Sequence, residues 1–474
     1  MIRAALTAFA LCTLSIVPAH SADGFNFTPT PEAGNYACRN LDTRGEITEI
    51  GQPMYQGDNG IFFRRTDFVD RFAMAETTRR FLSDLKEVLA AGGTTLVMLT
   101  LPPKGLANSG SVEQPAPEGA IYDPVVAQRS YEAYVNSLRT AVPLTVNLLE
   151  HVSADEIDGF YYKRDLHWRP EAARLAAKAI ADLVEPLASY QALEKQSFTS
   201  QVTDPDFVFR PKFSVALRLL CDDPLPDMVQ PFWTTQADEA SLDGLLGPST
   251  VPVALVGTSF SVVENPFNFE GFLQEALQLD TANFAIGGGG IDQSIYQWSH
   301  TARPPGEEPA FLVWELPFIQ RIEAMPDLTI RQIVPAAKGM CSDEEAIFAT
   351  EISLPAQGPV EVDISTPNSI VGDDFYIAAE LSNGALRVIT TELTYEDGEA
   401  EFLPIARPER VPSVDQLFLR LSDEFDAPLT SITLDASTSN ISRGIETQAR
   451  LHICRLDLQK TDQAANNENR TAPQ

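Results

Sequence analysis

Asp165 and His167 are two residues whose types and spacing could do chemistry. They lie two positions apart in the segment YYKRDLHWRP, from Tyr161 to Pro170. Residues i and i+2 of an extended segment project to the same side. The aspartate can therefore orient one imidazole nitrogen while the other nitrogen faces a nucleophile. The helix that Pro170 opens would bring a partly positive N-terminus close, which favours a neutral imidazole. The alternative is a surface-loop histidine that merely bonds to a carboxylate.

Ser259 is the residue best placed to be that nucleophile. The segment VPVALVGTSFS, residues 251–261, reads as a buried strand that ends at Gly257, with Ser259 in the following turn. In open α/β sheets the functional crevice lies at the carboxyl ends of the strands. A serine placed there can attack a carbonyl carbon while backbone N–H groups stabilise the oxyanion. The alternative is a serine that only caps a turn.

A run of glycines, Gly287 to Gly290, follows the next predicted strand. Glycine allows backbone N–H groups to approach a reacting oxygen closely. We therefore predict Gly288 and Gly289 as oxyanion donors, with Gln293 as a side-chain donor, while a flexible turn is the alternative. The run lacks the G-x-G-x-x-G and G-K-S/T patterns, so a phosphate-binding loop is not predicted.

The first 22 residues are typical of a cleaved secretory signal. Arg3 precedes an apolar run over residues 4–17, and small residues follow at Ala19, Ser21 and Ala22. The apolar run is too short to span a bilayer, although an uncleaved anchor is the alternative. We predict export to the periplasm.

Four cysteines remain after the predicted signal, and an oxidising compartment favours two disulfides among them. They are Cys38, Cys221, Cys341 and Cys454. Three connectivities are possible. Their distribution favours Cys38–Cys221 and Cys341–Cys454, because each pair then brackets one half of the chain. No pair has metal-ligand spacing, so we predict neither a metal nor a cofactor.

The formal net charge of -32 argues against nucleic acid and against anionic membrane surfaces as partners. The same charge disfavours any anionic polymer, unless the protein carries a local basic groove.

The elements that must position these residues alternate between helix and strand from about residue 70 to residue 317. Helices are expected over 71–91, 123–140 and 269–278 and from residue 170, and strands begin near residues 94, 143, 251, 283 and 311. This alternation predicts an open, mostly parallel α/β sheet. Residues 188–248 break the pattern, and we predict a long excursion packed on the sheet and tied back by Cys221.

The character of the chain changes after about residue 340. Seven short β-rich segments, separated by Gly, Asn, Asp and Pro turns, predict an antiparallel β-sandwich. The predicted division is therefore a signal peptide over 1–22, a catalytic α/β domain over 23–337, the sandwich over 338–458 and a disordered tail over 459–474.

The order of these motifs resembles a known family. D-x-H-W comes first, then GTSFS, the glycine run and FLVWELP, whereas ordinary SGNH hydrolases carry the serine block first. This circularly permuted order is similar to that of the SGNH-hydrolase-like alginate O-acetyltransferases of the AlgX/AlgJ type. The hairpin segment YQGDNGIFF, the β-rich C-terminal half and the cysteine distribution are closer to the AlgX type, which carries a carbohydrate-binding module. The residues after Glu315 depart from the family pattern.

The resemblance implies an acyltransferase in which Ser259 takes up acetyl, His167 is the general base and Asp165 orients it. The acceptor would be an alginate-like exopolysaccharide, and a membrane-bound O-acyltransferase would deliver the acetyl group. Further partners would be components of a polysaccharide export complex. We predict substrate contacts at Arg164, Arg169, Tyr376 and Arg387. An exported carbohydrate acetylesterase and a non-catalytic polysaccharide-binding scaffold are the alternatives.

Overall fold

The computed structural model describes residues 36–39, 41, 51–112, 122–152, 159–222, 225–238, 251–303, 306–318, 321–355, 358–364, 366, 369–412, 414–437 and 444–458. The predicted signal peptide and the predicted C-terminal tail lie outside these residues. No helix in the described ranges is long and apolar enough to cross a membrane.

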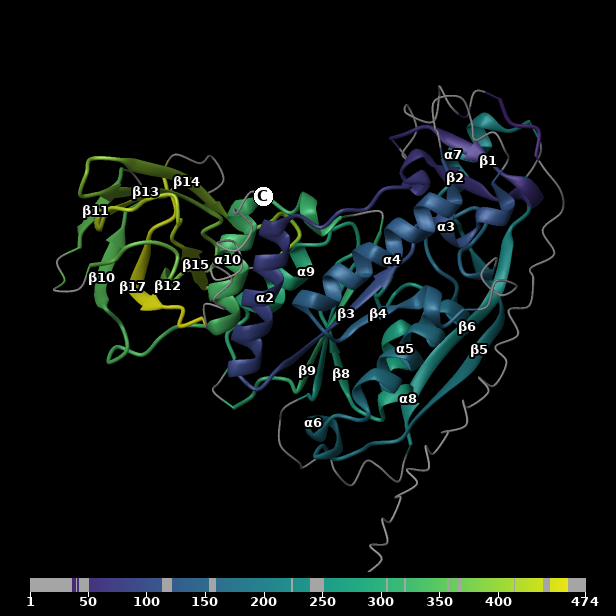
Figure 1. Ribbon diagram of the computed structural model, residues 1–474, viewed down its shortest axis with the longest axis horizontal. Helices are drawn as coiled ribbons and strands as arrows, with labels where there is room; N and C mark the ends of the chain where they lie inside the picture. Colours follow the sequence, from purple (N-terminus) through teal and green to yellow (C-terminus); the bar gives the residue numbers. More distant parts are fainter. Residues whose placement is uncertain are drawn as a thin grey trace, which may run out of the picture.

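A five-stranded parallel sheet forms the centre of the N-terminal two thirds of the chain (Figure 1). Its strands are β3 (Thr95–Leu101), β4 (Thr145–Asn147), β7 (Val253–Val256), β8 (Thr281–Asn283) and β9 (Phe311–Pro317), in the order β4-β3-β9-β7-β8. β7 and β9 are buried along their whole length. This burial explains why interior parallel strands have an almost continuously apolar sequence. β9 lies between β3 and β7. From this position the strands are added outward in both directions, to β4 on one side and to β8 on the other, as in a doubly wound sheet.

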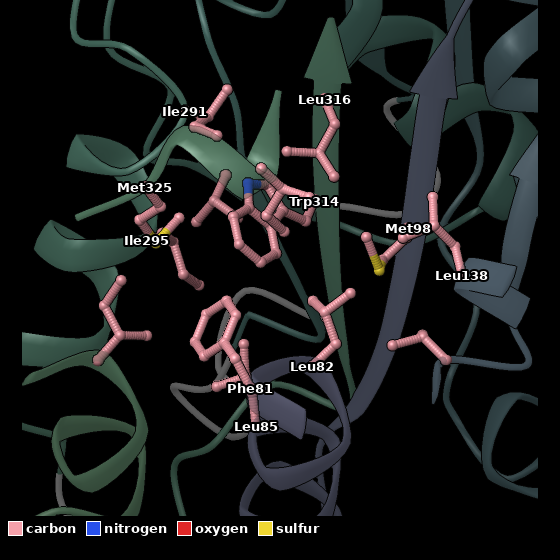
Figure 2. Close-up of a cluster of buried hydrophobic side chains, with 14 of the residues drawn as sticks. Phe81, Leu82, Leu85, Met98, Leu138, Ile291, Ile295, Trp314, Leu316 and Met325 are labelled. Carbon is pink, nitrogen blue, oxygen red and sulfur yellow. The ribbon is translucent and has the colours of Figure 1, made fainter. Parts of the chain in front are cut away.

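Helices cover both faces of this sheet. On one face lie α2 (Glu76–Ala91), α4 (Pro124–Ala141), α9 (Gln293–His300) and α10 (Asp327–Lys338); on the other lie α5 (Pro170–Val184) and α8 (Phe269–Leu277). Figure 2 shows the first of these cores, where Phe81 and Leu82 of α2 face Trp314 of β9 and Met98 of β3. The predicted α/β class is confirmed.

The C-terminal part forms two antiparallel sheets packed on each other. One has the order β10-β17-β12-β15 and the other β11-β16-β13-β14. The bounds are Phe348–Leu354 (β10), Val360–Asp363 (β11), Phe375–Leu381 (β12), Val388–Tyr395 (β13), Ala400–Ala406 (β14), Gln416–Arg420 (β15), Leu429–Asp435 (β16) and Thr447–Arg455 (β17). The sandwich is confirmed. Helix α10 packs against α2 and α9 of the α/β part and also against β15 of the sandwich. The predicted domain boundary at residue 337, within α10, therefore stays a prediction.

The excursion over 188–248 contains a long two-stranded ribbon, β5 (Phe198–Phe209) with β6 (Met228–Ala237), which lies against α8 (Figure 1). Short elements complete the described chain: α3 (Lys104–Ala107), α6 (Ala188–Gln191), α7 (Ser214–Leu220) and the hairpin β1 (Met54–Gln56) with β2 (Phe62–Arg64). Cys221, which directly follows α7, ties this region to Cys38.

Both predicted disulfides, Cys38–Cys221 and Cys341–Cys454, are present. The second lies beside His452, whose Nδ1 donates to the carbonyl of Cys341 at 3.0 Å. These three residues converge as metal ligands often do. The disulfide engages both sulfur atoms, however, so the group is not a thiolate site.

Candidate active site

The turn that carries Ser259 begins one residue after β7 ends, and its carbonyl groups are held individually. Every carbonyl from Gly257 to Ser261 accepts a hydrogen bond. In chain order the donors are the backbone N–H of Ile286 (3.1 Å), the backbone N–H of Ser261 (3.0 Å), Asn265 Nδ2 (2.5 Å), Trp168 Nε1 (3.0 Å) and Asn283 Nδ2 (2.7 Å). Such a fully bonded turn fixes the direction of the Ser259 side chain.

The loop that carries Asp165 and His167 precedes α5 and is fixed by a buried cation. Lys104 Nζ donates to the carbonyls of Tyr162 (2.7 Å), Lys163 (3.1 Å) and Asp165 (2.7 Å). The side chain of Lys104 is 2% exposed, so these contacts are shielded from solvent. An unpaired buried ammonium would be costly, and three carbonyl acceptors satisfy its three donors.

The structure brings Asp165, His167 and Ser259 into one hydrogen-bonded chain. His167 Nε2 lies 2.8 Å from Ser259 Oγ, and His167 Nδ1 lies 2.6 Å from Asp165 Oδ1. Asp165 Oδ1 also accepts the backbone N–H of His167 at 2.8 Å, and Oδ2 accepts the backbone N–H of Lys212. The spacing is that of a nucleophile, a base and the residue that orients the base.

Asp165 keeps its charge although it is buried. Burial acts to raise the pKa of Asp165, but the neighbouring His167 and hydrogen bonds from His167 and from the backbone of Lys212 together hold that pKa below its usual value. An ionised Asp165 favours a proton on Nδ1, which leaves Nε2 free to accept the proton of Ser259. The rings of Phe260 and Phe267 flank the imidazole, with centroids 4.7 Å and 5.1 Å from its own.

The glycine run approaches Ser259 at Gly287. A Cβ placed on Gly287 would lie 4.0 Å from the Ser259 Cβ. The Gly289 N–H is already donated to the carbonyl of Ile286 at 3.2 Å, so the prediction of Gly289 as an oxyanion donor is wrong. Gln293 Oε1 accepts the backbone N–H of Arg410 at 2.9 Å, which holds its amide toward the sandwich.

Within the described chain, no acceptor is assigned to the backbone N–H of Ser259 or of Gly287. These two N–H groups are therefore available to an oxyanion, whereas that of Gly289 is already donated, and Gln293 stays a prediction. Gly288, with a φ of 70°, stays a prediction.

Two predicted substrate contacts are wrong because the side chains are buried. Arg164 is 2% exposed, donates to the carbonyl of Pro226 at 2.7 Å and lies over the ring of Tyr36. Tyr376 is fully buried in β12 and donates its hydroxyl to the carbonyl of Gly339. Both residues stabilise the fold.

Arg169 offers little surface to a ligand. Its side chain is 12% exposed and pairs with Glu171. The aromatic residues of the same segment are core, since Tyr161, Tyr162 and Trp168 are all buried.

Arg387 is half-buried and belongs to a group of arginines at one end of the sandwich. It donates to the carbonyl of Pro408 at 3.0 Å. The backbone N–H of Arg407 donates to the carbonyl of Arg387 at 2.9 Å, and burial together with the neighbouring Arg387 lowers the pKa of Arg407. Arg410 is exposed, and its guanidinium would lie 3.3 Å from a Cβ on Gly288. The sandwich thus reaches the glycine run beside Ser259.

Sequence reasoning missed Lys104, Asn265 and Glu315. The LPPKG segment contains a lysine directly after a buried strand, which is an unusual place for an exposed charge. Asn265 gave no local signal, because its contact with Ser259 forms only in the folded turn. Glu315 carried a signal, since it interrupts an otherwise apolar strand.

A parallel α/β sheet with a serine after a central strand, faced by a histidine from an earlier loop, defines the SGNH-hydrolase-like class. The chain belongs to the family described as "SGNH hydrolase-like domain, acetyltransferase AlgX", whose family model matches residues 54–318.

Two relatives and one solved structure define the similarity. "Alginate biosynthesis protein AlgX" of Pseudomonas aeruginosa is 26% identical over 92% of this chain and 90% of that protein. "Probable alginate O-acetylase AlgJ" of Pseudomonas putida is 29% identical over 49% of this chain and 60% of that protein. The solved structure titled "Structural and functional characterization of Pseudomonas aeruginosa AlgX" shares the fold, with a TM-score of 0.69 and 24% identity over 87% of this chain and 97% of that one.

Proposed function

We propose that this protein is an exported polysaccharide O-acetyltransferase whose acceptor is an alginate-like exopolysaccharide. The observation that carries the proposal is the hydrogen-bonded chain from Asp165 through His167 to Ser259 Oγ. The names of its relatives, an alginate biosynthesis protein and a probable alginate O-acetylase, support the choice of reaction and of polymer.

In the first half-reaction Ser259 Oγ attacks the carbonyl carbon of an acetyl donor. His167 Nε2 takes the hydroxyl proton and then gives it to the leaving group, so that acetyl-Ser259 and the free donor alcohol or thiol are formed. The negative charge that develops on the carbonyl oxygen would be stabilised by the N–H groups of Ser259 and Gly287.

In the second half-reaction a sugar hydroxyl attacks the carbonyl carbon of acetyl-Ser259. His167 takes the proton of that hydroxyl and returns it to Ser259 Oγ as the ester bond to serine breaks. Transfer requires the sugar to outcompete water, so the polymer must be held with one hydroxyl beside Ser259.

The arginine group of the sandwich is the part of the surface best suited to hold an acidic polymer. Arg410 lies against the glycine run, and Arg387 donates to the carbonyl of Pro408, two residues before Arg410, in a protein whose net charge is -32. Local cations of this kind can bind carboxylates that the overall charge would repel. We keep Arg387 as a proposed substrate contact and add Arg410.

We also propose a periplasmic location. The two disulfides favour an oxidising compartment, in agreement with the predicted signal peptide. The acetyl group would be delivered by a membrane-bound O-acyltransferase, and the acceptor by a polysaccharide export complex.

The test is to incubate the purified protein with an activated acetyl ester and acidic oligosaccharides, and to measure acetylated sugar and free acetate separately. Acetylated sugar that depends on Ser259 would support the proposal. Acetate release without acetylated sugar would identify an acetylesterase instead. If Ser259→Ala left polymer acetylation unchanged in cells while deletion of the protein stopped secretion, the protein would be a binding scaffold.

A further inference from the structure

Glu315 is a fully buried carboxylate near the end of the central strand β9. Its neighbours Trp314 and Leu316 point into the core beneath α2, as Figure 2 shows, so Glu315 points to the opposite face of the sheet. Among the described residues no lysine or arginine forms an ion pair with it. A buried carboxylate is costly unless other groups bond to it, so its partners indicate why it is there.

Among the described residues, every hydrogen-bond partner of the Glu315 carboxylate comes from the turn that carries Ser259. Glu315 Oε2 accepts the backbone N–H of Thr258 at 2.8 Å and the hydroxyl of Ser261 at 3.0 Å. The hydroxyl of Thr258 lies 3.1 Å from the same oxygen. The carboxylate therefore binds Thr258, which precedes Ser259, and Ser261, which lies two residues after it.

Gly257 makes room for this contact. A Cβ on Gly257 would lie 2.7 Å from Glu315 Oε2 and 3.1 Å from the Glu315 Cβ. Any side chain at position 257 would push the carboxylate away from the turn, so the glycine of the GTSFS motif and the glutamate of FLVWELP form one unit.

We propose that Glu315 is a positioning residue for acyl transfer, which fixes the Ser259 hydroxyl and backbone N–H by holding Thr258 and Ser261. This inference rests on the proposed function of Ser259. Glu315 engages the Thr258 N–H, so the next donor along the turn, the Ser259 N–H, is left to face the developing oxyanion. A displacement of the turn by about 1 Å would lower the rate about 100-fold, because both the attacking atom and an oxyanion donor would move.

The test compares Glu315→Gln with Glu315→Leu in the full-length protein. The rate of acetyl-Ser259 formation from p-nitrophenyl acetate is measured across ester concentrations. The glutamine amide oxygen can still accept the Thr258 N–H, so Gln should retain the rate within about tenfold, whereas Leu should lose about 100-fold in the saturated rate with little change in KM. Glu323→Gln, which removes a half-buried carboxylate distant from the turn, should acylate like the wild type.

A folded Glu315→Leu variant that acylates at the wild-type rate would overturn the inference, and so would equal losses in Gln and Leu. Should the Leu variant not fold, Ser261→Ala and Glu315→Gln are combined instead. If the two residues act through their contact, the fold-decrease in acylation rate of the double variant is smaller than the product of the two single-variant fold-decreases. A fold-decrease equal to that product contradicts the inference. Absence of acetyl-Ser259 in the wild type would instead refute the proposed function itself.

Discussion

At the scale of single residues, the chemistry depends on how His167 is oriented. Its two ring nitrogens contact an aspartate and a serine at 2.6 and 2.8 Å, and the rings of Phe260 and Phe267 restrict its rotation. Because Asp165 stays ionised, it accepts a proton from Nδ1, and in the neutral imidazole this tautomer leaves Nε2 as the acceptor for the serine hydroxyl.

Replacing Asp165 with asparagine should therefore lower acetyl-enzyme formation by about 1,000-fold or more, because an amide can stabilise the wrong imidazole tautomer and cannot stabilise imidazolium. Stopped-flow measurement of p-nitrophenol release would report this rate. A rate close to that of the wild type, in a variant with the wild-type circular dichroism spectrum, would show that Asp165 does not orient the base.

The residues that converge here could be found in the sequence because each follows a local rule. Asp165 and His167 share one side of an extended segment, and Ser259 follows a buried strand. The contacts of Glu315 obey no local rule, since they depend on β9 lying beside β7. That of Asn265 forms only in the folded turn. The burial of Tyr376 was also beyond sequence reasoning, because alternation alone does not say which face of a strand is covered. That of Arg164 depends on contacts with Pro226 and Tyr36, which lie far away in the sequence.

At the scale of elements, an antiparallel bridge between Tyr161 and Trp168 closes the loop before α5, and Lys104 holds the carbonyls at its tip. Lys104→Met would leave three buried carbonyls without their shared donor, so it should lower the free energy of unfolding by about 3 kcal/mol. Lys178→Met is the matched control, since Lys178 is exposed on α5 and pairs only with Asp182. Equal urea midpoints for the two variants would contradict the assignment.

Glu315 makes the stability of the sheet sensitive to pH. Burial raises the pKa of Glu315 from 4.5 to about 7, against the hydrogen bonds from Thr258 and Ser261 that lower it. The folded state then binds this proton more tightly than the unfolded state, so the stabilisation is complete below pH 4.5 and is lost as the pH rises toward about 7. Glu315→Gln does not titrate. The wild type should therefore lose about 3 kcal/mol relative to this variant between pH 4.5 and pH 8.

Urea denaturation of both proteins at several pH values measures this difference. Parallel stability curves for the two proteins would mean that Glu315 titrates normally.

The elements themselves were predictable where apolar periodicity was strong, as in α4, α5 and β7. α2 begins at Glu76 rather than at residue 71 because Phe72 is held to Ser130 of α4 by its backbone, which keeps the preceding chain out of the helix. β10 was missed although Phe348, Ile352 and Leu354 alternate with more exposed residues. The acidic residues 343–345 that precede it concealed the signal.

At the scale of the whole molecule, the sandwich is held against the α/β part by a network of ion pairs. Arg80 of α2 pairs with Asp373 and Asp423, and Arg420 pairs with Asp84 and Asp373. Phe418 of β15 also packs against the buried ring of His300. Arg410 is held beside the glycine run by its own backbone N–H, which donates to Gln293 Oε1.

Arg410→Ala should raise KM for an acidic oligosaccharide acceptor about tenfold, since a charge-assisted contact with a carboxylate is lost. Acylation of Ser259 by a small neutral ester should not change. Glu409→Gln, at the exposed neighbouring position, should not weaken acceptor binding, and added salt should reduce the difference between Arg410→Ala and the wild type. An unchanged KM would place the polymer elsewhere.

The central claim is that Ser259 is acetylated with the help of His167. Mass spectrometry of the protein after brief exposure to an activated acetyl ester tests it most directly. We predict a mass increase of one acetyl group that maps to Ser259, appears far more slowly in His167→Ala and is transferred when acidic oligosaccharide is added. An unmodified Ser259, or equal labelling of Ser259 in His167→Ala, would contradict the account.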